Sequence, residues 1–306
     1  MADFTIDKSY ISQRYARFKV GTTTILGYSI AGEETVIQIP ELNVCFDAGR
    51  APQFCLTSDI LCLSHAHMDH IGGLAYFISQ KHFQGMKPPL ILCPDEAVDA
   101  IERMLKAFRD VERQHSPYQL VGMRDGEIYD VRKDFCIRTH AVHHAGPCLG
   151  YTLISVREKL RTEFLGKPSE ELAQLKRDGV DIQYKLEVPL VTYLGDTGMG
   201  PVFEHEDVIN AEILITECTF FEADHRMRAK SGKHLHVAEL ARILPRLSNK
   251  LVILTHVSRR TGLRKAKKIL KATVHEELLK NVHFLMDFEN AKDGGDADDL
   301  APPASN

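Results

Sequence analysis

The sequence has no long apolar run. No stretch approaches 18 uncharged apolar residues, so we expect no transmembrane helix and no membrane partner. The first ten residues, MADFTIDKSY, also lack the basic-then-apolar order of a secretory signal peptide. These two absences predict a cytoplasmic protein, with the nucleus as the alternative location.

Cysteine motifs are also missing. The seven cysteines are an odd number, no CxxC pair occurs, and most lie in apolar, strand-like runs such as VCF and ILCL. We therefore expect buried free thiols rather than a disulfide scaffold. A metal site in this chain would have to be built from histidine and carboxylate side chains.

Neither sign of charge dominates the chain, because 38 basic and 42 acidic residues give a net charge of −4. The last twenty residues hold six acidic residues and one basic residue, so the rest of the chain has a net charge of +1. One cationic run is dense, and its members are Arg259, Arg260, Arg264, Lys265, Lys267, Lys268 and Lys271. Such a run is either a solvated helix face or an anion-binding rim.

Short strand-like segments bounded by Gly, Pro, Asn and Asp fill the first half of the chain, and helical patterns alternate with strands later. The helices expected in the body span 72–83, 95–113, 236–247 and 261–273. This order favours an α/β fold with two mixed sheets flanked by helices, a four-layer αββα sandwich, over a doubly wound parallel sheet.

The chain shows no boundary between domains before its end. We expect one domain over residues 1–287, with a helical insertion at about 157–186. Pro168 and Ser169 mark the start of the inserted helix and Gly179 marks its end. Residues 288–306 are acidic and rich in Gly, Asp and Pro, a composition typical of a disordered tail.

The stretch LSHAHMDHIGG follows an apolar run and places His65, His67, Asp69 and His70 within six positions. Residues two apart point the same way only in an extended segment, so His65 and His67 converge if this stretch is a loop. Asp69 and His70 then point elsewhere, and the spacing serves two neighbouring cations. Imidazole and carboxylate ligands suit zinc, and manganese less well. A polar loop without metal is the alternative.

Three further segments offer ligands at the ends of strands. Asp196 ends the apolar run in YLGDTG, and His256 ends that in LVILTH. The third segment, THAVHHAGPCLGY, contains His140, His143 and His144. A strand that stops in a lone Asp or His leaves that side chain at the edge of the sheet, where α/β folds place their sites. Each of these residues alone is more often structural than a ligand.

The motifs together resemble a known family. HAHMDHIGGL resembles the signature of the metallo-β-lactamase superfamily. IPELNVCFDAGRAPQ, TECTF, GKHLH and THVSRR resemble, within it, the short form of ribonuclease Z, the tRNA 3′-processing endoribonuclease. The likeness is strongest to the plant-type enzymes and covers nearly the whole chain before the tail.

The resemblance implies two Zn²⁺ ions, with Mn²⁺ as a substitute. The implied ligands of the first ion are His65, His67 and His144. Those of the second are Asp69, His70 and His256, and the bridging ligand is Asp196. His144 is preferred to His140 and His143 because it lies six residues before a glycine, Gly150, as in the family.

The resemblance also implies catalytic roles. Asp69 would orient or deprotonate the attacking water, and Glu217 would fix His234 as general acid and phosphate contact. Without the resemblance, Glu217 is equally a surface carboxylate at a strand end, and His234 a residue at a helix N-terminus. His236 is a weaker candidate for a supporting role.

Two further residues match a family motif after His256. Ser258 and Arg260 match a Ser-x-Arg sequence that lies near the substrate phosphate in the family. Thr261 stands where the family usually has tyrosine. The cationic run starts at this motif, so an RNA-facing surface and a solvated helix face are equally good interpretations of it.

The reaction implied is removal of 3′ trailers from tRNA precursors by metal-activated hydroxide, leaving a 3′-hydroxyl. A pre-tRNA substrate and a homodimer are implied with it. One alternative is a metal-dependent phosphodiesterase or other hydrolase that acts on a small molecule. The near-zero charge of the body and the lack of a long Gly/Pro-rich arm favour that alternative. The other is a metal-bearing scaffold without turnover.

Overall fold

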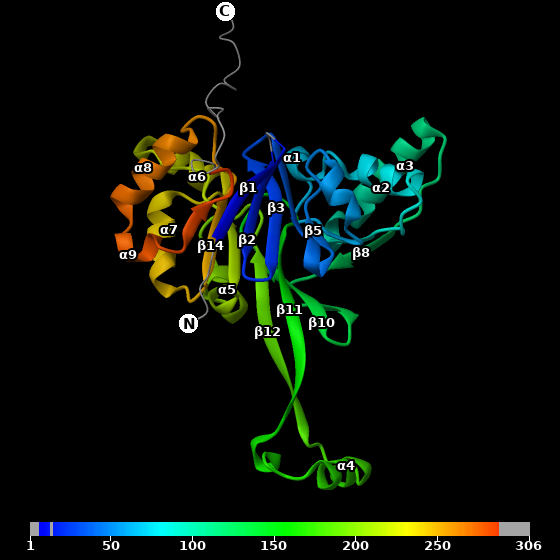
Figure 1. Ribbon diagram of the computed structural model, residues 1–306. Helices are drawn as coiled ribbons and strands as arrows, with labels where there is room; N and C mark the ends of the chain where they lie inside the picture. The colour runs from blue at the N-terminus through cyan, green and yellow to red at the C-terminus, as the bar shows by residue number, and fades with distance from the viewer. Residues whose placement is uncertain (1–5, 13–14, 288–306) are drawn as a thin grey trace, which may run out of the picture.

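The computed structural model describes residues 6–12 and 15–287, and the statements below concern those residues. The chain forms two stacked β-sheets with helices on their outer faces (Figure 1). The α/β class and the four-layer αββα sandwich predicted from the sequence are confirmed. The predicted tail, 288–306, lies outside the described residues.

The first sheet contains eight described strands in chain order. They are β1 Ile6–Ser12, β2 Tyr15–Val20, β3 Thr23–Ile30, β4 Glu34–Ile39, β5 Val44–Phe46, β6 Ile60–Cys62, β7 Leu90–Pro94 and β8 Gln119–Met123. Strands β1 to β5 pair antiparallel, whereas β5 to β8 pair in parallel. The loops after the parallel strands therefore meet at one edge of the sheet.

The second sheet has seven strands within the described part of the chain. They are β9 Ile128–Arg132, β10 Phe135–Ala141, β11 Leu149–Leu160, β12 Gln183–Tyr193, β13 Ile213–Glu217, β14 Leu251–Thr255 and β15 Val282–Phe284. It repeats the plan of the first sheet, because β9 to β12 pair antiparallel and β12 to β15 pair in parallel.

Helices cover the two outer faces (Figure 1). On the first sheet lie α1 Met68–Ile71, α2 Leu74–Phe83 and α3 Val98–Glu112. On the second lie α5 Glu206–Asn210, α6 Arg226–Gly232, α7 Val237–Ile243, α8 Leu263–Thr273 and α9 Glu276–Leu279. None of the helices in the described ranges is long and apolar enough to cross a membrane.

Apolar side chains from both sheets fill the space between them, which explains why the two sheets stack. The rings of Phe46 and Tyr193 stack with their centroids 4.8 Å apart. Tyr151 is also fully buried, and its hydroxyl donates to the carbonyl of Leu63 over 2.7 Å. Burying one such aromatic side chain stabilises the fold by roughly 2–3 kcal/mol. This core supports the loops at one edge of the two sheets, where the candidate ligand residues lie.

The insertion differs from the expected helical segment. Strands β11 and β12 run past the core as a long, twisted hairpin, and only α4, Ser169–Arg177, is an α-helix (Figure 1). The hairpin is paired out to Leu160 and Gln183. Both faces of its outer half meet solvent, so the strands there lack the alternation that identifies a strand in a sequence.

Some boundaries differ from the expected ones. The helix predicted over 95–113 begins only at Val98. Asp95 precedes it and accepts two hydrogen bonds from the guanidinium of Arg124 instead of capping the helix. The seven cysteines are free thiols, as predicted, and only Cys148 is incompletely buried.

Candidate metal centre

The loop after β6 carries the histidines of the opening motif. Residues 63–67 form neither a helix nor a strand, and His67 has extended backbone angles as the residue before α1. Asp69 and His70 lie on the short helix α1. This change of backbone directs the side chains of His65 and His67 to one place and those of Asp69 and His70 to another, as the spacing predicted.

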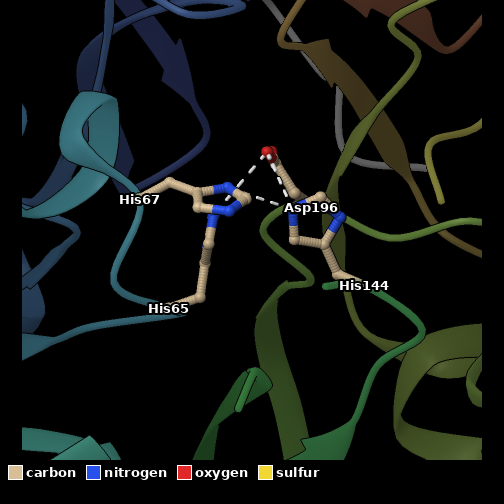
Figure 2. Close-up of side chains that lie close together, drawn as sticks. All are labelled: His65, His67, His144 and Asp196. Carbon is tan, nitrogen blue, oxygen red and sulfur yellow. Dashed lines mark hydrogen bonds and ion pairs between the residues drawn. The ribbon is translucent and has the colours of Figure 1, made fainter. Parts of the chain in front are cut away.

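The first group of ligand atoms belongs to His65, His67, His144 and Asp196. One atom from each of the four lies within 4.8 Å of the others. Figure 2 shows the three rings and the carboxylate around a common space, with His144 arriving from the loop after β10 and Asp196 from the end of β12. Nε2 of His144 is 3.2 Å from Nδ1 of His67. Nitrogens at this spacing are separated by about the distance between two ligands of one Zn²⁺.

The second group contains Asp69, His70 and His256, again within 4.8 Å of one another. Nε2 of His256 is 3.3 Å from Oδ2 of Asp69. The same Nε2 is 3.3 Å from Oδ2 of Asp196, which is also 3.4 Å from Nε2 of His70 and 3.8 Å from Nε2 of His65. Asp196 therefore lies between the two groups.

Four of the five imidazoles in the two groups are held by hydrogen bonds on the side away from the centre. Nδ1 of His70 donates to Asp47 over 2.7 Å, and Nδ1 of His144 donates to the carbonyl of Lys233 over 3.2 Å. The other two rings are held by hydroxyl groups. Nδ1 of His65 forms a hydrogen bond with Oγ of Ser64, and Nδ1 of His256 forms one with Oγ1 of Thr219, each over 3.0 Å. These partners leave Nε2 of all four rings facing the centre, as in metal sites whose histidines are oriented by outer hydrogen bonds.

The residues fit a divalent cation on two grounds. Nε2 of His65 and Nε2 of His70 are buried and have no hydrogen-bond partner among the described residues. Four carboxylates, those of Asp47, Asp69, Asp196 and Glu217, also meet here within a mostly dry region. Glu217 pairs with His234, and divalent cations would compensate the remaining carboxylates.

The same electrostatics appear in the pKa values. Burial, together with the neighbouring His70, lowers the pKa of His65 to about 2, so that ring is a neutral ligand at pH 7. Burial opposes charge on His70, but Asp196 and Asp47 outweigh it and raise the pKa of that imidazole. The pKa of the Asp196 carboxyl is lowered because His256 and His70 outweigh its burial. Without a cation, protons supply the positive charge that the carboxylates require.

Glu217 and His234 form a pair beside the two groups. Oε1 of the fully buried Glu217 accepts from Nδ1 of His234 over 2.7 Å and from the amide of Thr197 over 2.8 Å. Burial disfavours charge on His234, but the glutamate outweighs it and raises the pKa of the imidazole to about 9. One atom of His234 lies within 4.8 Å of ligand atoms of Asp196 and His256.

An open cavity of about 410 Å³ leads to the centre. Its lining includes His67, Asp69, His234, Ser258 and Arg260. It therefore brings all the residues expected to contact phosphate to the face where the metal ligands open to solvent. A second cavity, between α2 and α3, contains none of the predicted site residues.

The chain is similar to known proteins over most of its length. Residues 50–257, about two thirds of the chain, match the family described as Beta-lactamase superfamily domain. The chain is 32% identical over 251 residues to tRNase Z TRZ1 of Arabidopsis thaliana, covering 81% of this chain and 90% of that protein. The chain belongs to the ribonuclease Z family. Its members are metal-dependent hydrolases of the endoribonuclease type, so the resemblance to plant-type enzymes is confirmed.

Solved structures agree on the fold. The metallo-β-lactamase fold protein YhfI from Bacillus subtilis matches with a TM-score of 0.59 and 17% identity, over 84% of this chain and 93% of that one. The short form of human tRNase Z matches with a TM-score of 0.50 and 16% identity, over 84% and 92%. The fold and the His/Asp clusters together indicate a divalent-metal site in this ribonuclease Z family member.

The histidines that were runners-up lie elsewhere. His140 donates to Thr152 over 2.7 Å and belongs to a separate group with His205 and Asp207. His143 belongs to neither group of ligand atoms, nor to any other such group in the described ranges. His236 caps α7, because its ring accepts from the amide of Ala238. Its role is therefore structural.

Sequence reasoning missed three groups that support the site. Asp47 follows the apolar strand VCF. An aspartate at the end of an apolar strand is the pattern that identified Asp196, but it was not applied to Asp47. Lys233 orients His144 through its carbonyl, and its Nζ donates to the carbonyl of His144 over 3.1 Å. The amide of Gly32 donates to Oδ2 of Asp69 over 2.8 Å. Only the structure identifies these last two contacts, since backbone groups leave no mark in a sequence.

Proposed function

We propose that this chain is a dinuclear zinc endoribonuclease that removes 3′ trailers from tRNA precursors and leaves a 3′-hydroxyl. The observation that carries the proposal is the buried Glu217–His234 pair, placed beside two groups of metal ligands. A simple metal hydrolase needs the ligands alone, whereas departure of a ribose oxygen also needs a proton donor. The relative named tRNase Z TRZ1 supports tRNA as the substrate.

In this proposal, the ligands are divided between two ions as the resemblance implies. His65, His67 and His144 would hold one Zn²⁺, Asp69, His70 and His256 the other, and Asp196 would bridge them; Mn²⁺ is the substitute. Two such cations lower the pKa of bound water and neutralise charge on phosphoryl oxygens. Asp69 faces the cavity and is held by the amide of Gly32, so it is placed to orient the attacking water and accept its proton.

His234 is placed to protonate the leaving oxygen. Glu217 fixes the proton on Nδ1 and leaves Nε2 to face the cavity, because the carboxylate accepts from Nδ1. In the absence of a cation, Glu217 raises the pKa of the ring to about 9, so this carboxylate favours the protonated form that a general acid needs. The bond that breaks joins phosphorus to the 3′ oxygen of the mature RNA, and this oxygen receives the proton.

Ser258 and Arg260 complete the phosphate site. Both line the cavity, and the hydroxyl of Ser258 accepts from the amide of Arg260 over 3.3 Å. The guanidinium of Arg260 is exposed at the rim, so it is available to a substrate phosphate.

Two further properties belong to the proposal. A homodimer is supported by exposed apolar side chains on α2 and α3, namely Tyr76, Phe83, Phe108 and Val111. A cytoplasmic or nuclear location is supported by the free thiols, which are typical of reducing compartments. Light scattering of the purified chain and imaging of a tagged copy test these two points.

The test is incubation of the zinc-loaded protein with a panel of pre-tRNAs and mapping of the new 3′ ends. Cleavage directly after the discriminator nucleotide is expected, and the variants His65→Ala and Asp196→Ala should abolish it while remaining folded. A protein that leaves every pre-tRNA intact but hydrolyses a small phosphodiester would instead support the small-molecule alternative. The open cavity is the observation that favours that alternative. Zinc without any hydrolysis would support a scaffold.

A further inference from the structure

A second cationic segment lies beside the metal centre, on helix α6. Arg226, Arg228 and Lys230 are all solvent-exposed on this seven-residue helix. Within residues 6–12 and 15–287, none of the three forms an ion pair with a carboxylate. Asp224 is the exposed acidic residue that precedes them, and Glu222 is engaged by Lys265. The helix surface therefore keeps a net positive charge.

The cationic run after His256 is different. Arg259 binds Glu33, and Lys267 binds Asp287 over 2.9 Å. Lys265 binds Glu222. Three of its seven cations are thus neutralised by carboxylates of the same chain. The run that stood out in the sequence is a weaker attractor of phosphate than its composition suggests, whereas α6 retains its full charge.

Both ends of α6 adjoin the reaction site. The ring of His225, directly before the helix, packs 5.7 Å from the ring of Phe220, which lines the cavity. Directly after the helix come Lys233, which contacts His144, and His234. In Figure 1, α6 and α1 lie at the same end of the two sheets. None of the residues of α6 lines the cavity, but the segments directly before and after the helix contact or include residues that do, so α6 flanks the approach to the metal centre.

We infer that α6 binds the phosphates of the mature RNA, on the 5′ side of the scissile bond, and not those of the trailer. This rests on the proposed function, because it uses His234 as the donor of the proton. The oxygen that receives this proton belongs to the last nucleotide of the mature RNA. That nucleotide must lie beside His234, and the chain runs from His234 directly back into α6.

The chemistry of the contact is that of phosphate, not of a base. Arg226, Arg228 and Lys230 provide cations without a rigid pocket around them, which suits a backbone that is bound irrespective of its sequence. Met227 is 75% exposed between the first two and adds an apolar surface for a ribose. Arg226 and Lys230, four residues apart, lie on the same side of α6, and Arg228 lies on another. Such a surface serves many tRNAs equally.

The test compares the two products of the reaction as ligands. One is a tRNA that ends in the 3′-hydroxyl of the discriminator, and the other is a trailer oligonucleotide with a 5′-phosphate. The variant R226Q/R228Q/K230Q should bind the tRNA at least about tenfold more weakly. The slope of log Kd against log salt should fall by about two to three, since each lost phosphate contact lowers it by about 0.9. Its affinity for the trailer should stay unchanged.

A matched control is available on α3. R103Q/K106Q/R109Q also removes two Arg and one Lys from exposed positions, at the far side of the first sheet. It should bind both RNAs as wild type does. Gln has a helix propensity close to that of Arg and Lys, so both triple variants should keep their circular dichroism and metal content.

The outcomes separate this inference from the proposed function. Wild-type protein that cleaves pre-tRNA, with an α6 variant that binds the mature tRNA normally, would overturn the inference alone. An α6 variant that loses affinity for the trailer instead of the mature tRNA would show that α6 binds RNA on the 3′ side of the scissile bond, and would also overturn the inference. Failure of wild type to cleave any pre-tRNA would overturn the proposed function.

Discussion

Asp47 and His70 lie 23 residues apart in the sequence, and the carboxylate accepts a hydrogen bond from Nδ1 of the imidazole over 2.7 Å with both side chains fully buried. The carboxylate also accepts from the hydroxyl of Tyr193 over 2.5 Å and from the amide of Ser64 over 2.7 Å. Asp47 therefore ties a candidate metal ligand of the first sheet to the core of the second.

Removing the charge of Asp47 should weaken metal binding. Asp47→Asn keeps a side chain that tolerates the left-handed backbone of this position, φ 56°, while the negative charge behind His70 is lost. We expect zinc affinity to fall by about 10- to 100-fold, measured by competition with a chromogenic chelator. Asp134→Asn, at a carboxylate that is 69% exposed, is the control and should bind zinc normally. Equal affinities for the two variants would contradict the role of Asp47.

The titration of His234 should depend on Glu217. In the metal-free protein, nuclear magnetic resonance of the imidazole should show a pKa near 9 for His234. In Glu217→Gln, burial acts without the opposing charge, so the pKa should fall below its ordinary value of about 6.5. Because the pKa is raised in the folded state, the pair stabilises the fold fully below pH 6.5, and this stabilisation is lost as the pH rises through about 9. An unchanged pKa in the variant would show that Glu217 does not set it.

Lys233 offers a test of backbone strain beside the site. Its φ of 53° is left-handed, a conformation that costs a residue with Cβ about 1–2 kcal/mol. Lys233→Ala and Lys233→Gly both lose the hydrogen bond from Nζ to His144, so they differ only in the backbone. In urea unfolding, the free energy of unfolding of the glycine variant should equal or exceed that of the alanine variant by up to about 1 kcal/mol. The gain is smaller than the strain because glycine also has a larger conformational entropy in the unfolded state. A clearly less stable glycine variant would contradict the strain.

The hairpin arm should be separable from the fold. Leu160 and Gln183 face each other in register, so residues 161–182 can be replaced by Asn-Gly, which forms a two-residue turn between paired strands. We expect an unchanged zinc content and nearly the same unfolding midpoint, because α4 contributes no buried residue to the core. If the arm grips tRNA, KM for a pre-tRNA should rise with kcat little changed. An unaltered KM would remove the arm from substrate binding.

The clustering of the candidate ligands could be predicted from the sequence because they follow a physical rule: apolar strands end, and the polar residues after them gather at one edge of the sheet. Asp196 and His256 illustrate this, since both come directly after buried strands. Asp47 follows the same rule after β5, and was missed because it lies eighteen residues before His65, outside the histidine motif. Its φ of 56° is left-handed, so β5 ends at Phe46 and is only three residues long.

Other features could not be read from the sequence. The strands of the arm are exposed on both faces, so their side chains carry no alternation, whereas α4 has a clear start and end. The three cations of α6 alternate with neutral residues, whereas the run from 259 to 271 holds seven cations in thirteen residues and is therefore conspicuous in the sequence. Only the structure reveals which of them are already neutralised by carboxylates, because the partners, such as Glu33 and Asp287, lie far away in the chain.

The division of the ligands between the two sheets has a consequence for folding. The first half of the chain supplies His65, His67, Asp69 and His70, and the second supplies His144, Asp196 and His256. Each candidate group of ligands is complete only when the two halves of the chain have packed together. A bound cation would therefore link the two halves and stabilise their packing. At a thousand times its dissociation constant, one ion would add about 4 kcal/mol to the free energy of unfolding. Depletion of zinc would then shorten the lifetime of the molecule as well as stop its chemistry.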